Sequence, residues 1–464
     1  MLSLPPGIKV LTAAAMRDAE AEAMAGGVSA LALMERAAAA AVAAILVHCP
    51  APRALVLCGP GNNGGDGYGI AAGLRARGVD VEVAAYGKPG KGAAAIMAER
   101  WGRPALDLAD ARPAPLIVDA LFGTGLARSL PTEIETVLAR LAGHGQVVAI
   151  DIASGIDADH GTALSPPLVP NLTVTFGAAK RGHVQSDGAQ AVGRLVVADI
   201  GLPPISSEVS LGCRPLLRPL PGDVHKYARG HVLVIENDDP HGGAARLSAL
   251  AALKSGAGLV TLVGPANPPA ALALMQRDDD EAERLLLDPR TSVIVLGPGL
   301  PDTPRTQAWL FRLLPDEIPL VLDAGALSQV TPQTLSEAAA PLVLTPHEGE
   351  FVRLFGPIEG DRIDAVLAAS KAAGAIVLLK GPQTIVAAPW GEVRVNTHAS
   401  PYLASAGSGD VLAGLVAGLI AQGLNGFDAA VIAAWLHGEA GQRGGPGLIA
   451  DDLPALMPAI LKSL

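Results

Sequence analysis

The chain has 464 residues, of which 50% are hydrophobic and 17% are charged, and its formal net charge is −11. This length is sufficient for two domains, and the apolar content excludes global disorder. The negative charge argues against a nucleic-acid partner, because binding to a phosphate backbone needs positive charge. Local backbone N–H groups can still bind a nucleotide.

The cysteines and the N-terminus bear on the compartment. Cys49, Cys58 and Cys213 are odd in number and have no metal-ligand spacing, which is typical of a reducing compartment. The first nine residues lack the features of a signal peptide. The apolar run 37–47 is too short to span a membrane, so we expect a buried helix there. The sequence predicts a cytoplasmic protein without a membrane partner.

In the N-terminal half, apolar β-branched runs alternate with helical patterns, which predicts a parallel α/β fold. We expect a Rossmann-like, doubly wound open sheet, whose ligands bind at the carboxyl ends of its strands. The predicted strands are 54–58, 79–85, 116–119, 147–151 and 172–176.

The first of these strands runs into a glycine-rich loop, 59–67, that opens a helix. Its glycines are expected to allow positive φ and the close approach of a ligand. Exposed N–H groups at the helix N-terminus suit a phosphate or another anion. A flexible turn is the alternative, but a turn does not need Asn62, Asn63 and Asp66, so a ligand site is favoured.

Two more polar loops follow strands. Asp119 precedes the Gly-Thr-Gly sequence 123–125, and Asp151 precedes Ser154. Each aspartate alone could be a helix cap or a turn residue. Three polar loops at consecutive strand ends instead indicate a shared site. Its carboxylate, amide and hydroxyl oxygens suit a hard cation, including a monovalent one.

Together these loops resemble the N-terminal domain of the NAD(P)H-hydrate epimerase family, over about residues 10–210. The resemblance implies interconversion of the two C6 epimers of hydrated NADH and NADPH (NADHX and NADPHX). It implies a potassium ion held by Asn63, Asp119 and Ser154, with Asp151 as the catalytic acid or base. The substrate contacts it implies are Asn62, Asn63, Gly64, Gly65, Asp66, Gly123, Thr124, Gly125, Leu126, Ala127, Arg128, Ser129 and Asp151.

A proline-rich stretch of weak periodicity predicts a linker at about 202–224. The first domain is expected at 1–212, so that the linker overlaps its end, and the second domain at 225–464. The second half restarts an α/β pattern. Its predicted strands are 232–235, 259–263, 293–296, 320–323, 342–345 and 376–380, with a hairpin of 384–388 and 393–396, and helices at 244–255 and from 410, 429 and 453.

Three motifs of the second half carry chemistry. Glycines 407 and 409 surround the start of a long apolar helix, whose N–H groups can stabilise phosphoryl oxygens while Asp410 moves a proton. A simple N-cap is the alternative for Asp410. The segment 380–384 is predicted to be a nucleotide-binding turn. The alternative is a hairpin whose lysine is only solvated. His347 either contacts substrate or only begins a helix.

With His225-Lys226 and the segment 345–350, these motifs resemble the ribokinase-like superfamily, and more closely its ADP-dependent NAD(P)H-hydrate dehydratase branch, over about residues 225–460. The resemblance implies that the S epimer is dehydrated to NAD(P)H with ADP or ATP as co-substrate and Mg²⁺ as a helper, and that Asp410 is catalytic. The implied nucleotide contacts are Lys380, Gly381, Pro382, Gln383, Thr384 and Gly409, and the implied hydrate contacts are Ala244, Gly299, His347 and Asp410.

Four features depart from the family patterns: Ala153 replaces a proline, 236–239 replaces a Gly-Gly-Ser turn, Gly325 replaces an aspartate, and the stretch 265–289 differs from the family's usual sequence. The leading hypothesis is a bifunctional isomerase and lyase that repairs nicotinamide nucleotides. One alternative is a ribokinase-like small-molecule kinase with an N-terminal binding module. Another is a scaffold with a decayed dehydratase site. The choices between NADH and NADPH and between ADP and ATP stay open, and a homo-oligomer is compatible with the resemblance.

Overall fold

The computed structural model describes residues 2–217, 220, 222–237, 242–265 and 271–464. The chain forms two compact units, Ile8–Ser207 and Met1–Gly7 with Glu208–Leu464. These limits differ from the expected boundaries at 212 and 225. Part of the expected linker forms two short strands of the second unit. β11 (Val209–Leu211) pairs with β21 (Val393–Asn396), and β12 (Leu216–Leu217) pairs with β1 (Leu2–Ser3).

The first unit is built on a seven-stranded parallel sheet with the order β10-β8-β7-β6-β3-β4-β5. All five predicted strands are present, and two edge strands, β5 and β10, join them. The strands are β3 (Arg53–Cys58), β4 (Asp80–Ala85), β5 (Leu106–Asp107), β6 (Leu116–Ala120), β7 (Gln146–Ile150), β8 (Leu172–Phe176) and β10 (Arg194–Ala198), with β2 (Val10–Leu11) pairing β9 (Ala179–Lys180) beside them.

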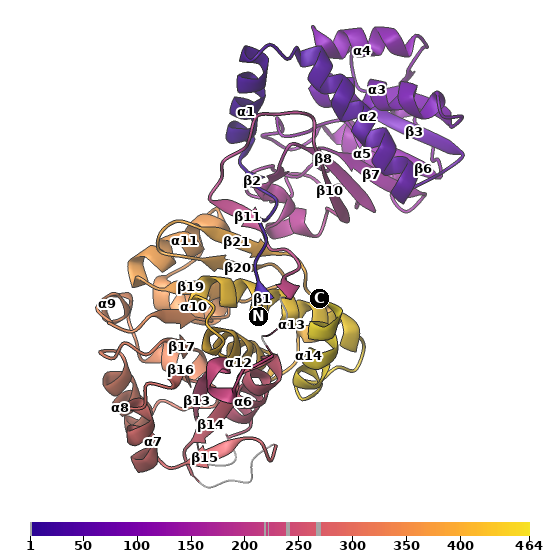
Figure 1. The fold of residues 1–464 in the computed structure, drawn as a ribbon. Coiled ribbons are helices and arrows are strands. Elements are labelled where there is room, and N and C mark those ends of the chain that lie inside the picture. The colour runs from indigo at the N-terminus through magenta and orange to yellow at the C-terminus, as the bar shows by residue number, and fades with distance from the viewer. Residues whose placement is uncertain (1, 218–219, 221, 238–241, 266–270) are drawn as a thin grey trace. The chain divides into compact units, whose positions relative to one another are not determined.

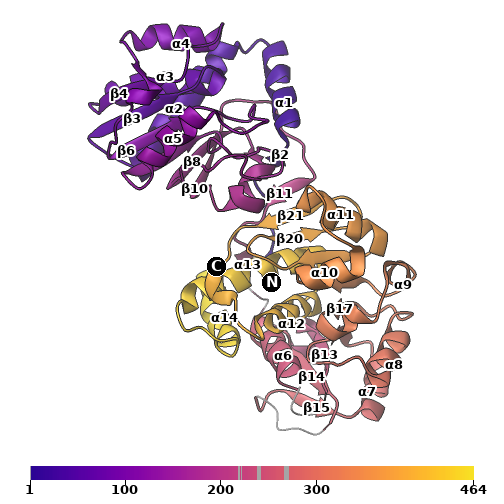
Figure 2. The ribbon, with the colours of Figure 1, turned by 180° about the vertical axis from the view of Figure 1, so that it is seen from behind.

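Helices cover both faces of this sheet, as Figures 1 and 2 show from opposite sides. Side chains of α2, α3 and α4 form one apolar core with one face of the strands, and α5 forms another core with the other face. The helices are α1 (Ala13–Ala25), α2 (Ala30–His48), α3 (Asn62–Arg75), α4 (Ala93–Trp101) and α5 (Thr132–Leu141).

The expected buried helix at 37–47 is longer in the structure, since α2 covers Ala30–His48. Among the described residues it is the one helix whose length and apolar composition would suffice to cross a membrane. One face of it, including Ala37, Ala41 and Ile45, is buried in the core against the sheet.

The second unit has a ten-stranded mixed sheet with the order β11-β21-β20-β19-β18-β17-β16-β13-β14-β15. The expected hairpin is present, because β20 and β21 pair antiparallel. Besides β11, the strands of this sheet are β13 (His231–Ile235), β14 (Leu259–Val263), β15 (Met275–Arg277), β16 (Thr291–Leu296), β17 (Leu320–Leu322), β18 (Leu342–Leu344), β19 (Ile376–Leu379), β20 (Thr384–Ala387) and β21 (Val393–Asn396). β1 (Leu2–Ser3) and β12 form a separate pair.

The main core of this unit lies between the sheet and four helices, α6, α12, α13 and α14 (Figure 1). The carboxyl ends of β13, β16, β17, β18 and β19, which are neighbours in the sheet, lead into the predicted motifs. The helices are α6 (Gly243–Ser255), α7 (Asp279–Leu286), α8 (Pro304–Leu313), α9 (Pro332–Ser336), α10 (Glu348–Phe355), α11 (Arg362–Ala373), α12 (Ser408–Ala421), α13 (Gly426–Gly444) and α14 (Asp452–Ser463).

Candidate active sites

The glycine-rich loop of the first unit is shorter than expected, because α3 already begins at Asn62. None of its glycines has a positive φ, so the expectation of positive φ is wrong. The glycines instead permit close packing. A Cβ atom on Gly64 would lie 1.9 Å from the carbonyl oxygen of Gly59, and one on Gly67 would lie 2.8 Å from Cβ of Ala120. This packing draws α3, and with it Asn63 and Asp66, against the strand ends.

Of the three residues predicted to hold a cation, Asp119 and Ser154 are hydrogen-bonded to each other at these ends, whereas Asn63 contacts neither through a hydrogen bond among the described residues. Ser154 donates from Oγ to Oδ1 of Asp119 over 2.7 Å and from its backbone N–H to Oδ2 over 2.9 Å. Burial raises the pKa of Asp119, against these hydrogen bonds, which lower it. Both amide atoms of Asn63 are buried without a partner in the described part of the chain. A buried unpaired amide is unfavourable, so the Asn63 side chain is available to pair with a ligand or a water molecule.

Asp151 lies immediately after β7 with a φ of 66°, a left-handed conformation that is uncommon for aspartate and that often marks functional sites. Its Oδ1 accepts hydrogen bonds from Nζ of Lys180 over 2.7 Å and from Oγ1 of Thr175 over 2.9 Å. Burial by itself would raise the pKa of Asp151, but Lys180 and Thr175 lower it below its usual range, with help from His183. Asp151 is therefore held as a carboxylate.

A second carboxyl group near Asp151 has the opposite tendency. Burial is the main cause that raises the pKa of Asp66 well above its ordinary value, and the charges of Asp151 and Glu20 raise it further. Burial likewise raises the pKa of Glu20, on α1. The site thus combines a carboxyl group whose pKa is lowered with two whose pKa is raised, an arrangement suited to acid–base chemistry. Sequence reasoning did not find Glu20, Thr175 or Lys180.

The loop after β6 lies between Asp151 and Asn63. A Cβ atom on Gly123 would be 3.0 Å from Oδ2 of Asp151 and 3.4 Å from Cγ of Asn63, so the loop passes directly between them. The backbone N–H of Thr124 donates to Oδ2 of Asp151 over 3.4 Å. The outer part of the loop, with predicted substrate contacts, is exposed at Gly125, Ala127, Arg128 and Ser129.

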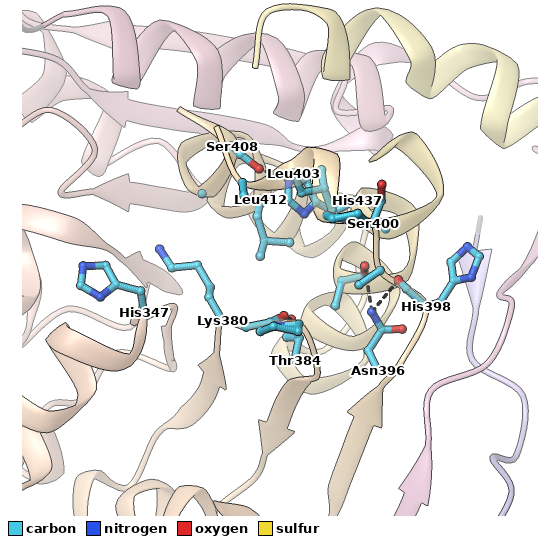
Figure 3. Close-up of a pocket in the computed structure, with 18 of the residues that line it drawn as sticks. His347, Lys380, Thr384, Asn396, His398, Ser400, Leu403, Ser408, Leu412 and His437 are labelled. Atoms are coloured by element: carbon cyan, nitrogen blue, oxygen red, sulfur yellow. Dashed lines mark hydrogen bonds between the residues drawn. The ribbon is translucent and has the colours of Figure 1, made fainter. Parts of the chain in front are cut away.

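In the second unit, a cavity of about 710 Å³ opens at the start of α12 (Figure 3). Six predicted contacts line it: His347, Lys380, Gly381, Pro382, Thr384 and Gly409. In Figure 3, Lys380 extends toward the start of α12, and His347 and His398 lie at opposite ends. Among the described residues, the predicted contacts that are not part of this lining are Gln383, Ala244, Gly299 and Asp410.

Lys380 pairs with the carboxylate of Asp323 beside the cavity and acts electrostatically on that of Asp410. Its Nζ is 2.8 Å from Oδ1 of the buried Asp323, and a Cβ atom on Gly409 would be 3.1 Å from the same nitrogen. Burial, together with the charge of Asp323 and against the effect of Lys380, raises the pKa of Asp410 to about 6. Asp410, in the first turn of α12, therefore changes charge near neutral pH, as a general base should.

The histidines of the cavity differ in role. His347 begins α10, where its Nδ1 accepts from the backbone N–H of Gly349 over 3.0 Å, so the helix-start alternative holds, although the side chain also lines the cavity. His437, on α13, is 3.0 Å from Oγ of Ser408 through Nε2, and burial lowers its pKa to about 4. Ser408 and His437 were not predicted from the sequence.

Two of the departures from the family patterns have physical explanations. Glu236 is buried and its Oε1 is 2.6 Å from Nε of Arg246, so its charge is paired inside the fold. The rest of that turn, 238–239, lies outside the described residues. A Cβ atom on Gly325 would be 1.8 Å from the carbonyl oxygen of Leu300. No side chain fits there, so the local backbone of this chain requires glycine at position 325.

Replacing Gly325 by alanine should therefore destabilise the second unit by about 1–3 kcal/mol, the usual effect of overpacking. Urea unfolding would measure it, with Gly243→Ala as the control, because a Cβ atom at Gly243 has open space in the helix α6. Equal stability of the two variants would contradict this interpretation of Gly325.

Known proteins resemble both halves of the chain. Residues 232–446 match the family model described as NAD(P)H-hydrate dehydratase, and residues 30–182 match the YjeF-related protein N-terminus. A dehydratase from Bacillus subtilis, solved as an ADP/ATP-dependent NAD(P)H-hydrate dehydratase co-crystallised with ATP/Mg²⁺, is 28% identical and covers 53% of this chain and 94% of its own, with a TM-score of 0.48.

Whole-length relatives share the order of the two halves. A bifunctional NAD(P)H-hydrate repair enzyme of Moorella thermoacetica is 37% identical over 89% of this chain and 88% of its own length. Enzymes with the same description from Synechocystis and Coxiella burnetii are 35% and 34% identical, over 93% and 94% of this chain and 90% and 96% of their own lengths. The chain therefore belongs to the family of bifunctional NAD(P)H-hydrate repair enzymes.

Proposed function

We propose that the chain repairs hydrated NADH and NADPH in two steps. The first unit interconverts the R and S epimers, and the second dehydrates the S epimer with an adenine nucleotide as co-substrate. The observation that carries the proposal is one acid–base carboxyl group in each unit: Asp151 directly follows strand β7, and Asp410, in the first turn of α12, lies near Lys380, which follows strand β19. Family membership favours this reading over the kinase and scaffold alternatives.

In the first unit, a potassium ion fits the residues around Asn63. The unpaired buried amide of Asn63, the carboxylate of Asp119 and the hydroxyl of Ser154 are oxygen donors of the kind that hard cations prefer. Such an ion would supply positive charge for an anionic group of the substrate. The N–H groups at the start of α3 would add to that attraction.

In the second unit, Lys380, the turn Gly381–Thr384 and Gly409 would hold the phosphates of the nucleotide in the cavity of about 710 Å³. Asp410 would take the proton from the C6 hydroxyl group as its oxygen bonds to the transferred phosphorus, and the bond from phosphorus to the nucleotide breaks. Loss of the phosphate and of a ring proton then restores the dihydropyridine. Mg²⁺ would arrive with the nucleotide phosphates.

One absorbance assay tests both activities. Hydrated NADH, as mixed epimers, is incubated with the protein, Mg²⁺, K⁺ and ADP or ATP, and recovery of the reduced-nicotinamide absorbance is followed. We expect complete recovery in a fast phase, and Asp151→Ala should limit that phase to the S epimer's share. A control without protein measures the slow spontaneous exchange of epimers. No recovery with either nucleotide would contradict the dehydratase proposal, and nucleotide consumption without recovery would favour a kinase.

A further inference from the structure

Lys180 is a deeply buried basic group of the first unit's site, with 1% of its side chain exposed. Its ammonium group is 2.7 Å from Oδ1 of Asp151, donates to Oγ1 of Thr175 over 2.7 Å and donates to the carbonyl oxygen of Phe176 over 3.1 Å. An ammonium group has three donors, so these contacts use all of them. Lys180 therefore acts on a substrate through Asp151 and not by direct contact.

Asp66 is the second acidic residue of this arrangement. It is three residues after Asn63 on α3, hence on the same face of that helix, and its charge interacts with those of Asp151, Glu20 and Lys180. The other titratable or charged groups that act on this cluster are Arg17, beside Glu20, and His183, whose burial lowers its pKa to about 4 and keeps it neutral.

We propose that Lys180 is a positioning residue that fixes Asp151 as the proton acceptor of the first unit's site and thereby leaves Asp66 as the proton donor. This inference rests on the proposed epimerase function. Burying an ammonium group is unfavourable by several kcal/mol unless it is well paired, so a lysine at this place would be expected to have a role that a neutral residue cannot fill.

The division of roles accounts for epimerisation with balanced atoms. The hydroxyl group on C6 takes a proton from Asp66 and leaves as water, while the electron pair of the ring nitrogen forms a C=N bond to C6. A water molecule then adds to the opposite face of C6 and gives its proton to Asp151. One water is released and one consumed, and the proton returns from Asp151 to Asp66 through solvent before the next turnover.

The test follows a purified epimer of NADHX without nucleotide, so that the dehydratase is silent, and separates the epimers by chromatography. Lys180→Met should lower kcat/KM by about 100-fold. It should also move the acidic limb of the pH profile upward by about 1–3 pH units, because Asp151 loses the cation that lowers its pKa. Lys180→Arg, which keeps the charge, should restore the limb, and the exposed Lys91→Met is the matched control.

Asp66→Asn is nearly isosteric and tests the donor if Lys180→Met fails to fold. Urea unfolding of the Lys180→Met variant would show whether its first unit is folded. For Asp66→Asn, we expect about 100-fold slower epimerisation with an unchanged acidic limb. An unshifted limb in folded Lys180→Met, or a wild-type rate in Asp66→Asn, would overturn the assignment. If the unmodified protein does not exceed the spontaneous rate, the epimerase proposal itself fails, which is a distinct outcome.

Discussion

Replacing Asp410 by asparagine is expected to lower the rate of dehydration by about 10³-fold, because it removes the group that would accept the hydroxyl proton. The structure supports this magnitude, since burial raises the pKa of Asp410 to about 6 and so matches it to proton transfer near neutral pH. The absorbance assay with pure S epimer measures the rate. In the unmodified protein, the same rate should fall as the pH drops through about 6.

The same substitution should make the second unit more stable. A carboxyl group whose folded-state pKa is raised favours folding below its unfolded pKa of 3.8, and this contribution is lost as the pH rises through about 6. At pH 7 the buried charge of Asp410 therefore destabilises the fold. Asparagine should add about 1–3 kcal/mol, reduced by its loss of a favourable charge at the start of α12.

Urea unfolding at pH 7 and at pH 4 measures the change, and the difference between the proteins should shrink at the lower pH. Asp428→Asn is a suitable control, since Asp428 is in the first turn of α13 and exposes its carboxyl group to solvent. Loss of activity together with loss of stability would instead mean that Asp410 has a structural role.

Much of the fold could be predicted from the sequence because its strands are buried runs of apolar β-branched residues. Every predicted strand of the two main sheets is present, and the polar loops follow them at one edge of each sheet. That edge brings Asp119 and Ser154, which are 35 residues apart, into a hydrogen bond of 2.7 Å. The predicted fold class, two α/β domains built on largely parallel sheets, is confirmed.

The rest depended on neighbours that a sequence does not reveal. Lys180 reaches Asp151 because β8 happens to lie beside β7, and Ser408 reaches His437 because α12 packs on α13. The glycines of the 59–67 loop were assigned to backbone freedom, whereas helix packing explains them. β11 and β12 are too short for a period to be read, so they were assigned to a linker.

Replacing Lys380 by methionine should have the second large effect, on nucleotide binding. The lysine extends into the cavity while holding the buried carboxylate of Asp323 at 2.8 Å. Removing it takes a charge-assisted contact from the nucleotide phosphates, and we expect about 100-fold weaker binding of ADP, measured by calorimetry. It also leaves Asp323 buried and unpaired, which should destabilise the second unit by about 3–5 kcal/mol.

The effect on ADP binding and the effect on stability can be separated, because only the loss of stability depends on the carboxylate of Asp323. In the double variant Asp323→Asn with Lys380→Met, the unpaired charge is gone, so stability should return to within about 1 kcal/mol of the unmodified protein. Binding of ADP should stay weak, since the cation that would meet the phosphates is still missing. If the double variant instead binds ADP normally, Lys380 serves to neutralise Asp323 and the nucleotide is held by the N–H groups at the start of α12 alone.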